Sequence, residues 1–203
     1  MELRKGFVKI AMVVAVTVPL VGAAAPATFE VDGAHSKVLF KVRHRGISTV
    51  TGQFTQFDAT IDVDPEDLST LSAEATIDVA SVDTEVERRD NHLRSADFFD
   101  VENHPQMEFV STRAEVMGDN QVKLHGTLTL RGVTKPIVLD TTFGGVLAGD
   151  EGDRIGLMAS TTINRRDFGV SYGGLLDSGV PVISDEVEIY IEFQATEATE
   201  SDD

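Results

Sequence analysis

Alternation between apolar and polar residues is the dominant pattern of this 203-residue sequence. It is clearest over residues 186–195, where every odd position is apolar and the even positions are Glu, Tyr or Gln. Successive side chains of a β-strand point to opposite faces, so this segment predicts a strand with one buried and one exposed face. The same pattern predicts further strands at 38–42, 59–63, 73–79, 107–111, 122–130, 137–143 and 155–163.

The number of predicted strands indicates the architecture. An antiparallel sheet of about eight strands can close into a barrel with room for one ligand. We therefore expect an all-β fold, an antiparallel β-barrel of about eight strands. The even positions of 38–42 and the odd positions of 187–193 are all apolar, and we expect them to line one continuous apolar cavity. His44 shares the parity of the first strand, which predicts that it points inward near one mouth of the barrel.

One segment, residues 83–99, departs from the alternation. Thr84 and Glu87 have the spacing of a capping box, and the run 85–94 is compatible with a short helix beside the barrel. Phe98 and Phe99 follow it, and at least one of them should face the core or close one end of the barrel. An ordinary core anchor is the alternative to direct contact with a ligand.

The N-terminus has the order of segments typical of a secretory signal peptide. Three basic residues precede an apolar run at 10–21, and small residues fill 22–27. The apolar run is shorter than the roughly 20 residues of a membrane-spanning helix, so we expect export and cleavage after Ala25 or Ala27; an uncleaved signal anchor is the alternative. The predicted organisation is therefore a signal peptide at 1–27, one barrel domain at 28–195 and a dispensable acidic tail at 196–203.

Composition and motifs argue against several classes of function. The formal net charge is −17, and such an excess of carboxylates should repel nucleic acid and anionic membrane surfaces. The sequence has no Cys, no Gly-x-Ser-x-Gly elbow and no His-Glu-x-x-His pair, and its five histidines lack metal-ligand spacing. We therefore expect no nucleic-acid partner, no enzyme activity, no metal and no cofactor.

Basic residues stand out against this acidic background. One group comprises Arg88, Arg89, His92 and Arg94, and another is the pair at 165–166. Such clusters could meet an anionic head group such as a phosphate. The alternative is a structural role, in which Arg89 pairs with Asp90 and Arg166 pairs with Asp167 to tie loops to the barrel.

A series of motifs resembles the YceI-like family of polyisoprenoid-binding proteins. The motifs occur in the family's order over residues 29–195, nearly the whole chain after the signal peptide. They are Asp-Gly-Ala-His-Ser at 32–36, Phe-Lys-Val-Arg-His at 40–44, Gly-Gln-Phe at 52–54, and the runs at 78–84, 89–100, 104–105, 126–136 and 163–169. Arg166 is a mild departure, because a serine or lysine is common there, and it puts only head-group contacts in doubt.

The resemblance implies a lipocalin-like barrel with a helix beside it. Its apolar interior would bind, store or transport a long apolar lipid of the polyisoprenoid or isoprenoid quinone type. The family is typically periplasmic or secreted, and homodimers occur in it. An isoprenoid-modifying enzyme and a stress-response interaction module with a filled core are the alternative functions.

Parity and the family motifs together predict the residues of the lipid site. Apolar side chains would surround the tail, while His44, His92 and Arg165 would bind a polar head group at the mouth. The predicted set is Val38, Phe40, Val42, His44, His92, Phe98, Phe99, Phe109, Leu128, Arg165, Phe168 and Ile191.

Overall fold

The computed structural model describes residues 25–150 and 152–198, so most of the predicted signal peptide lies outside the described residues. Within them the chain forms eleven strands, one α-helix and three 3-10 helices. The strands are β1 (Ala27–Val31), β2 (Lys37–His44), β3 (Ser48–Phe54), β4 (Phe57–Asp64), β5 (Asp67–Asp78), β6 (Val82–Asp83), β7 (Gln106–Val116), β8 (Gln121–Leu130), β9 (Val133–Leu147), β10 (Arg154–Asn164) and β11 (Ile183–Glu197). The helices are α1 (Glu87–Arg94), η1 (Gly33–His35), η2 (Val79–Ser81) and η3 (Arg165–Phe168).

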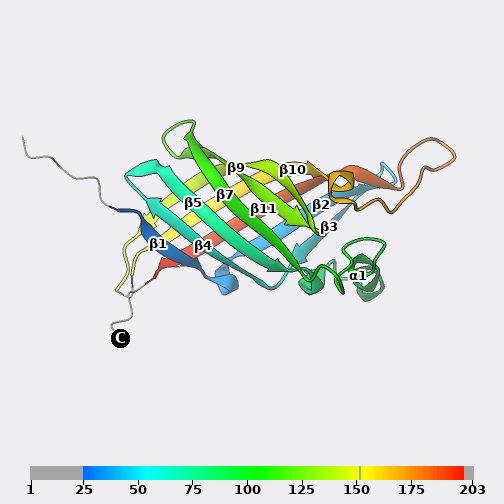
Figure 1. The fold of residues 1–203 in the computed structure, drawn as a ribbon, viewed down its shortest axis with the longest axis horizontal. Coiled ribbons are helices and arrows are strands. Elements are labelled where there is room, and N and C mark those ends of the chain that lie inside the picture. Colours follow the sequence, from blue (N-terminus) through cyan, green and yellow to red (C-terminus); the bar gives the residue numbers. More distant parts are fainter. Residues whose placement is uncertain (1–24, 151, 199–203) are drawn as a thin grey trace, which may run out of the picture.

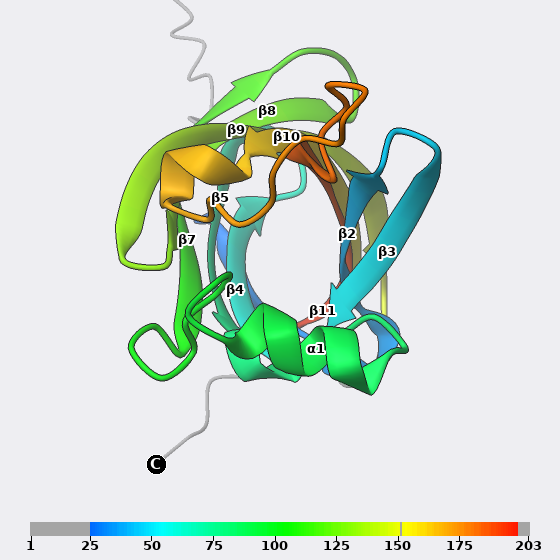
Figure 2. The same cartoon turned by 90° about the vertical axis from the view of Figure 1, so that its right-hand side faces the viewer.

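Eight of the strands form a closed ring, seen from the side in Figure 1 and along its axis in Figure 2, which confirms the predicted antiparallel barrel. Their order is β1-β4-β5-β7-β8-β9-β10-β11, and β11 pairs back with β1. Strand β11 spans the barrel because residues 195–197 pair with β1 and residues 183–192 pair with β2. Strands β2, β3 and β6 extend the wall beyond the ring.

The two ends of the barrel differ. At the end where β1 lies, large apolar side chains such as Phe29, Ile61 and Val63 pack into a buried core. At the other end, which we call the mouth, α1, η3, the β2–β3 turn and segment 170–182 come together (Figure 2). Among the described helices, none is long and apolar enough to cross a membrane.

Two inward-facing glycines make room for phenylalanine rings on the barrel wall. A Cβ atom at Gly52 would lie 2.3 Å from the Phe40 ring, and one at Gly126 would lie 2.5 Å from the Phe109 ring. Both distances are far below van der Waals contact. These rings therefore lie over the glycines of the neighbouring strands, where a larger residue would push them away.

The helix begins later than predicted, and the prediction that Thr84 and Glu87 form a capping box was wrong. Helix α1 starts at Glu87, its N-cap residue is Val86, and no side chain caps it. Thr84 instead lies buried before the helix, where its N–H and hydroxyl donate to Asp90. Asp90 can accept both bonds because the chain from 84 to 90 folds back on itself, so a buried contact replaces the cap.

The last strand is longer than predicted. Its alternation ends at Ala195, but Thr196 pairs with both Glu30 and Arg154, and Glu197 pairs with Phe29. Two residues assigned to the tail therefore pair within the barrel, while the boundary of the folded domain between 195 and 196 stays a prediction. At the other terminus β1 starts at Ala27, so cleavage after Ala25 would leave this strand complete.

Candidate functional site

A central apolar cavity lies inside the barrel between the mouth and the buried core. Its volume is about 150 Å³. Its walls carry inward side chains from strands on all sides, and Arg165 is the single charged residue in them. Three cross-strand pairs of β2 and β11 belong to the wall: Val38 with Ile191, Phe40 with Ile189, and Val42 with Val187. The inward parity predicted for both strands is therefore confirmed.

Two further cavities continue this space in both directions. A mouth cavity of about 320 Å³ shares Phe40, Val42, Leu93 and Phe98 with the central cavity. A deep cavity of about 60 Å³ shares five wall residues with it, among them Phe109 and Ile191. The three cavities thus form a series along the barrel, and each boundary between two cavities is made by side chains that line both of them.

The mouth cavity has a mixed polar and aromatic wall. His44, Arg89 and His92 line it together with Tyr172 from segment 170–182. The His92 ring makes edge contacts with Phe98 at 5.0 Å and with Tyr172 at 4.7 Å between ring centres. Its Nε2 atom lies 2.9 Å from the Asp97 carboxylate. The mouth therefore offers an imidazole held in place by aromatic rings, beside a guanidinium group.

Arg165 lies next to the central cavity with only 5% of its surface exposed. Its guanidinium group donates hydrogen bonds to the backbone oxygens of Val170, Ile183 and Ser184 and to the Asp185 carboxylate. Burial lowers the pKa of Arg165, and the nearby Asp185 carboxylate partly offsets this effect. With its donors directed at these acceptors, Arg165 connects η3 to the start of β11.

The structural ion pairs anticipated for the arginine motifs have other partners. Arg166 pairs with Asp185 rather than with Asp167. Arg89 donates to the hydroxyl and backbone oxygens of Thr84, while Asp90 accepts from that same residue. Both arginines do tie loops to the barrel, but through residues that their local sequence does not indicate.

The predicted site residues fall into three groups. Val38, Phe40, Val42, Phe98, Phe99, Phe109, Leu128, Arg165 and Ile191 line the central cavity. His44 and His92 line the mouth cavity. Phe168 is 2% exposed and packs in the apolar core beside the cavity, without lining either space. Contact of any of these residues with a ligand stays a prediction.

Six residues of the mouth cavity were absent from the predicted set: Val50, Arg89, Leu93, Tyr172, Val182 and Ile183. Arg89 and Leu93 lie in a family-like motif, and the helical spacing that places Arg89, His92 and Leu93 on adjoining faces could have indicated them. Tyr172 lies in a glycine-rich segment with no periodic pattern, so nothing local predicts its position. Among the described residues no group of His, Cys, Asp or Glu is arranged to hold a metal ion.

The fold and these cavities define a class, the closed antiparallel β-barrels with an apolar interior. The YceI-like domain model matches residues 29–195, so the chain belongs to the YceI-like family. A UPF0312 protein of Vibrio cholerae serotype O1 is 34% identical over 175 residues, which cover 85% of this chain and 92% of that protein.

Solved structures show the same fold. The crystal structure of Burkholderia cenocepacia BcnA has a TM-score of 0.71 and 30% identity, and covers 82% of this chain and 99% of that one. A domain from Saccharophagus degradans, described as a polyisoprenoid binding domain implicated in plant cell wall breakdown, has a TM-score of 0.66 and 18% identity. That match covers 85% of this chain and 99% of the domain, and at this identity it shows the fold alone.

Proposed function

We propose that this protein binds a long apolar lipid of the polyisoprenoid or isoprenoid quinone type, with the tail inside the barrel and the polar end at the mouth. The observation that carries the proposal is the wall of the central cavity, which is apolar except for Arg165. The Saccharophagus domain of the same fold, described as polyisoprenoid-binding, supports it. The family resemblance of the sequence motifs points to the same class of ligand.

The size of the cavities determines how the tail would fit. A dry apolar cavity of about 150 Å³ can hold a ligand as large as benzene, so the central cavity alone matches about one isoprene unit. A longer tail would pass through the mouth, central and deep cavities in turn, after the shared side chains between them change rotamer. Each buried methylene contributes about 0.8 kcal/mol, so a tail that fills the series gains affinity with every unit.

We further propose that the protein carries or stores the lipid in the periplasm and does not transform it. The predicted signal peptide supports export. Arg165 is the charged residue of the central cavity wall, and its hydrogen bonds to backbone oxygens favour a structural role over a catalytic one. The interaction-module alternative predicts a filled core, whereas the barrel contains a series of cavities. Homodimer formation stays a prediction.

Organic extraction of the purified protein, followed by mass spectrometry, tests the proposal. We expect an unsaturated long-chain lipid at up to one molecule per barrel. A similarly sized acidic protein without a cavity, purified from the same cells, is the control. Equal amounts of every lipid in both extracts would contradict the proposed function.

A further inference from the structure

Two exposed apolar side chains stand at the tip of the mouth. Ile47, in the β2–β3 turn, is 85% exposed, and Leu175, in segment 170–182, is 71% exposed. The two segments adjoin, since the N–H of Arg45 donates to the backbone oxygen of Val182 at 2.9 Å. In Figure 1 the orange segment after η3 extends beyond the barrel on the same side as the turn. We call Ile47 and Leu175 the rim pair.

The segment that carries Leu175 is a preformed small hairpin. The N–H of Val182 donates to Gly174, the N–H of Leu176 donates to Val180, and Leu175 forms an isolated bridge with Pro181. Leu175 is therefore presented to solvent by an ordered backbone. Tyr172, three residues earlier, lines the mouth cavity, so the rim pair lies beside the entrance to the apolar interior.

The β2–β3 side of the rim is rich in basic residues for so acidic a protein, although Glu186 and Glu188 line one small pocket with Lys41 and Arg43. Between Asp32 and Asp58 the sequence contains four basic residues, Lys37, Lys41, Arg43 and Arg45, and no acidic one. Residues 170–184 contain a single carboxylate, Asp177. Arg43 donates to Thr49 and to the backbone of Gly46, and within the described residues neither Arg43 nor Arg45 forms an ion pair.

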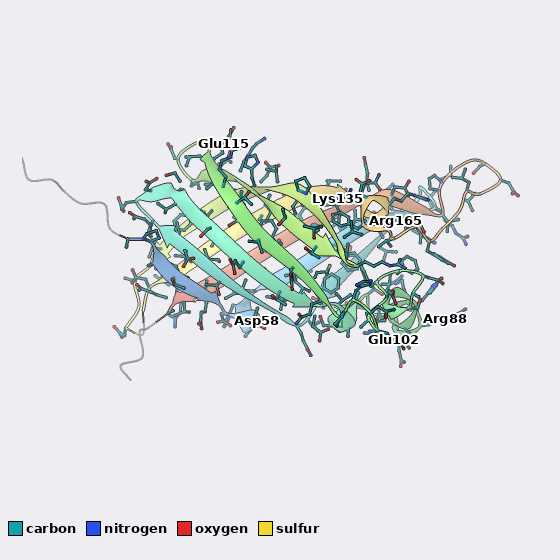
Figure 3. The ribbon with its side chains drawn as sticks, in the orientation of Figure 1. Asp58, Arg88, Glu102, Glu115, Lys135 and Arg165 are labelled. Carbon is teal, nitrogen blue, oxygen red and sulfur yellow. The ribbon has the colours of Figure 1, made fainter. Side chains whose placement is uncertain are left out.

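The opposite end has no comparable run of basic residues. The β9–β10 connection carries Asp150 and Asp153, and in the β7–β8 region Glu115 is paired with Arg113. Figure 3 shows Glu115 on that side and Arg88, Glu102 and Arg165 toward the mouth. The net charge of −17 predicts repulsion from anionic surfaces. Salt screens charges that lie more than about 10 Å from such a surface, so the groups nearest to it dominate the interaction. An uneven distribution of charge can therefore orient the protein with its basic side toward the surface.

From this arrangement we propose that the mouth docks on the surface of a lipid bilayer that contains anionic phospholipids. Ile47 and Leu175 enter the interfacial region, and Arg43 and Arg45 face the phosphates. An apolar tail can then pass between bilayer and cavity without crossing water. This membrane contact goes beyond the proposed function, since lipid binding from solution does not require it.

Vesicle sedimentation tests the docking, with phosphatidylcholine vesicles compared with vesicles that also contain phosphatidylglycerol. We expect the protein to bind the anionic vesicles more strongly, and Ile47→Ser combined with Leu175→Ser to weaken that binding about tenfold or more. The matched control is Met117→Ser combined with Leu147→Ser, whose side chains are 54% and 67% exposed at the opposite end. The control should bind like the unchanged protein.

A separate variant tests the electrostatic contribution to membrane docking. Arg45→Gln should weaken binding to anionic vesicles several-fold, by about one basic residue's contribution, and should leave the small affinity for neutral vesicles unchanged. Binding of a soluble short isoprenoid alcohol, measured without vesicles, should be equal in all variants. This last measurement separates a failure of docking from a failure of lipid binding.

Three results would overturn the proposal. The first is that the protein sediments with neither kind of vesicle. The second is that the rim and control variants lose vesicle binding equally. The third is that the rim variant changes the monomer–dimer equilibrium but does not change vesicle binding. The third would show that the rim pair faces a second copy of the chain.

Discussion

Buried arginine at the edge of an apolar cavity needs several acceptors, because an unpaired guanidinium group there would lose its hydration without compensation. Arg165 has four, three backbone oxygens and the Asp185 carboxylate. Three of them belong to β11 and one follows η3. The hydrogen bonds therefore favour a structural role for Arg165 over the head-group role that its motif suggested.

Replacing this residue tests that role. Arg165→Ala should lower the free energy of unfolding by about 2–4 kcal/mol, because it leaves buried acceptors unpaired and opens space beside the cavity. Arg166→Ala, which removes a half-exposed ion pair with Asp185, is the control and should cost less than about 1 kcal/mol. Denaturant unfolding measures both. If Arg165→Ala leaves the stability unchanged and selectively weakens head-group binding, Arg165 binds the head group and does not have a structural role.

His44 and His92 remain the candidates for head-group selectivity. Both line the mouth cavity, where water can reach the polar end of a ligand. Replacing either by Ala should weaken binding of a pyrophosphate-bearing isoprenoid about tenfold, whereas a neutral alcohol of equal length should bind as before. Titration of the two ligands against each variant measures the difference. Equal weakening of both ligands, with a lower melting temperature, would mark these histidines as structural.

At the scale of the elements, β11 organises the barrel. It pairs with β10 along its length, with β2 near the mouth and with β1 at the other end. Its last residues close the ring, since the N–H of Glu197 donates to Asp153 and the N–H of Ala198 donates to Thr28. The clean alternation of 187–195 made this strand easy to predict. Alternation cannot show, however, how far the pairing between β11 and β1 extends.

Truncation tests the predicted end of the domain against the observed end of β11. A chain ending at Ala198 should unfold at the same temperature as the full chain, because it keeps every described contact of β11. A chain ending at Ala195 loses the pairs of Thr196 and Glu197 with β1 and should be less stable by about 1–3 kcal/mol. Thermal unfolding of both proteins provides the comparison. Equal melting temperatures would place the true boundary at 195.

Element prediction succeeded where large apolar residues alternate over a long segment, and it missed three shorter strands. In β3, Gly52 and two threonines interrupt the apolar pattern, β1 has five residues and β6 has two. The helix was predicted in the right place, while its start depended on the buried contact between Thr84 and Asp90. Such contacts follow from tertiary packing, which local propensity does not describe.

At the scale of the whole molecule, the sequence predicted the barrel and most of its inner surface. Parity identified the walls contributed by β2 and β11, because every second residue must share a face. It could not separate Phe168, which fills the core, from Phe109, which lines the cavity. It also could not place Tyr172 beside His92, since that contact depends on the path of a long irregular segment.

If the apolar interior receives the lipid tail, a substitution that fills the central cavity should block binding. Ile189 lines the central cavity beside Phe40, whereas Glu192 on the same strand is exposed. Ile189→Trp should reduce the affinity for geranylgeraniol about tenfold or more while the protein stays folded. Glu192→Trp, an equally large change on the outer face, should leave the affinity unchanged. Equal affinities of the two variants, measured by titration, would contradict binding inside the barrel.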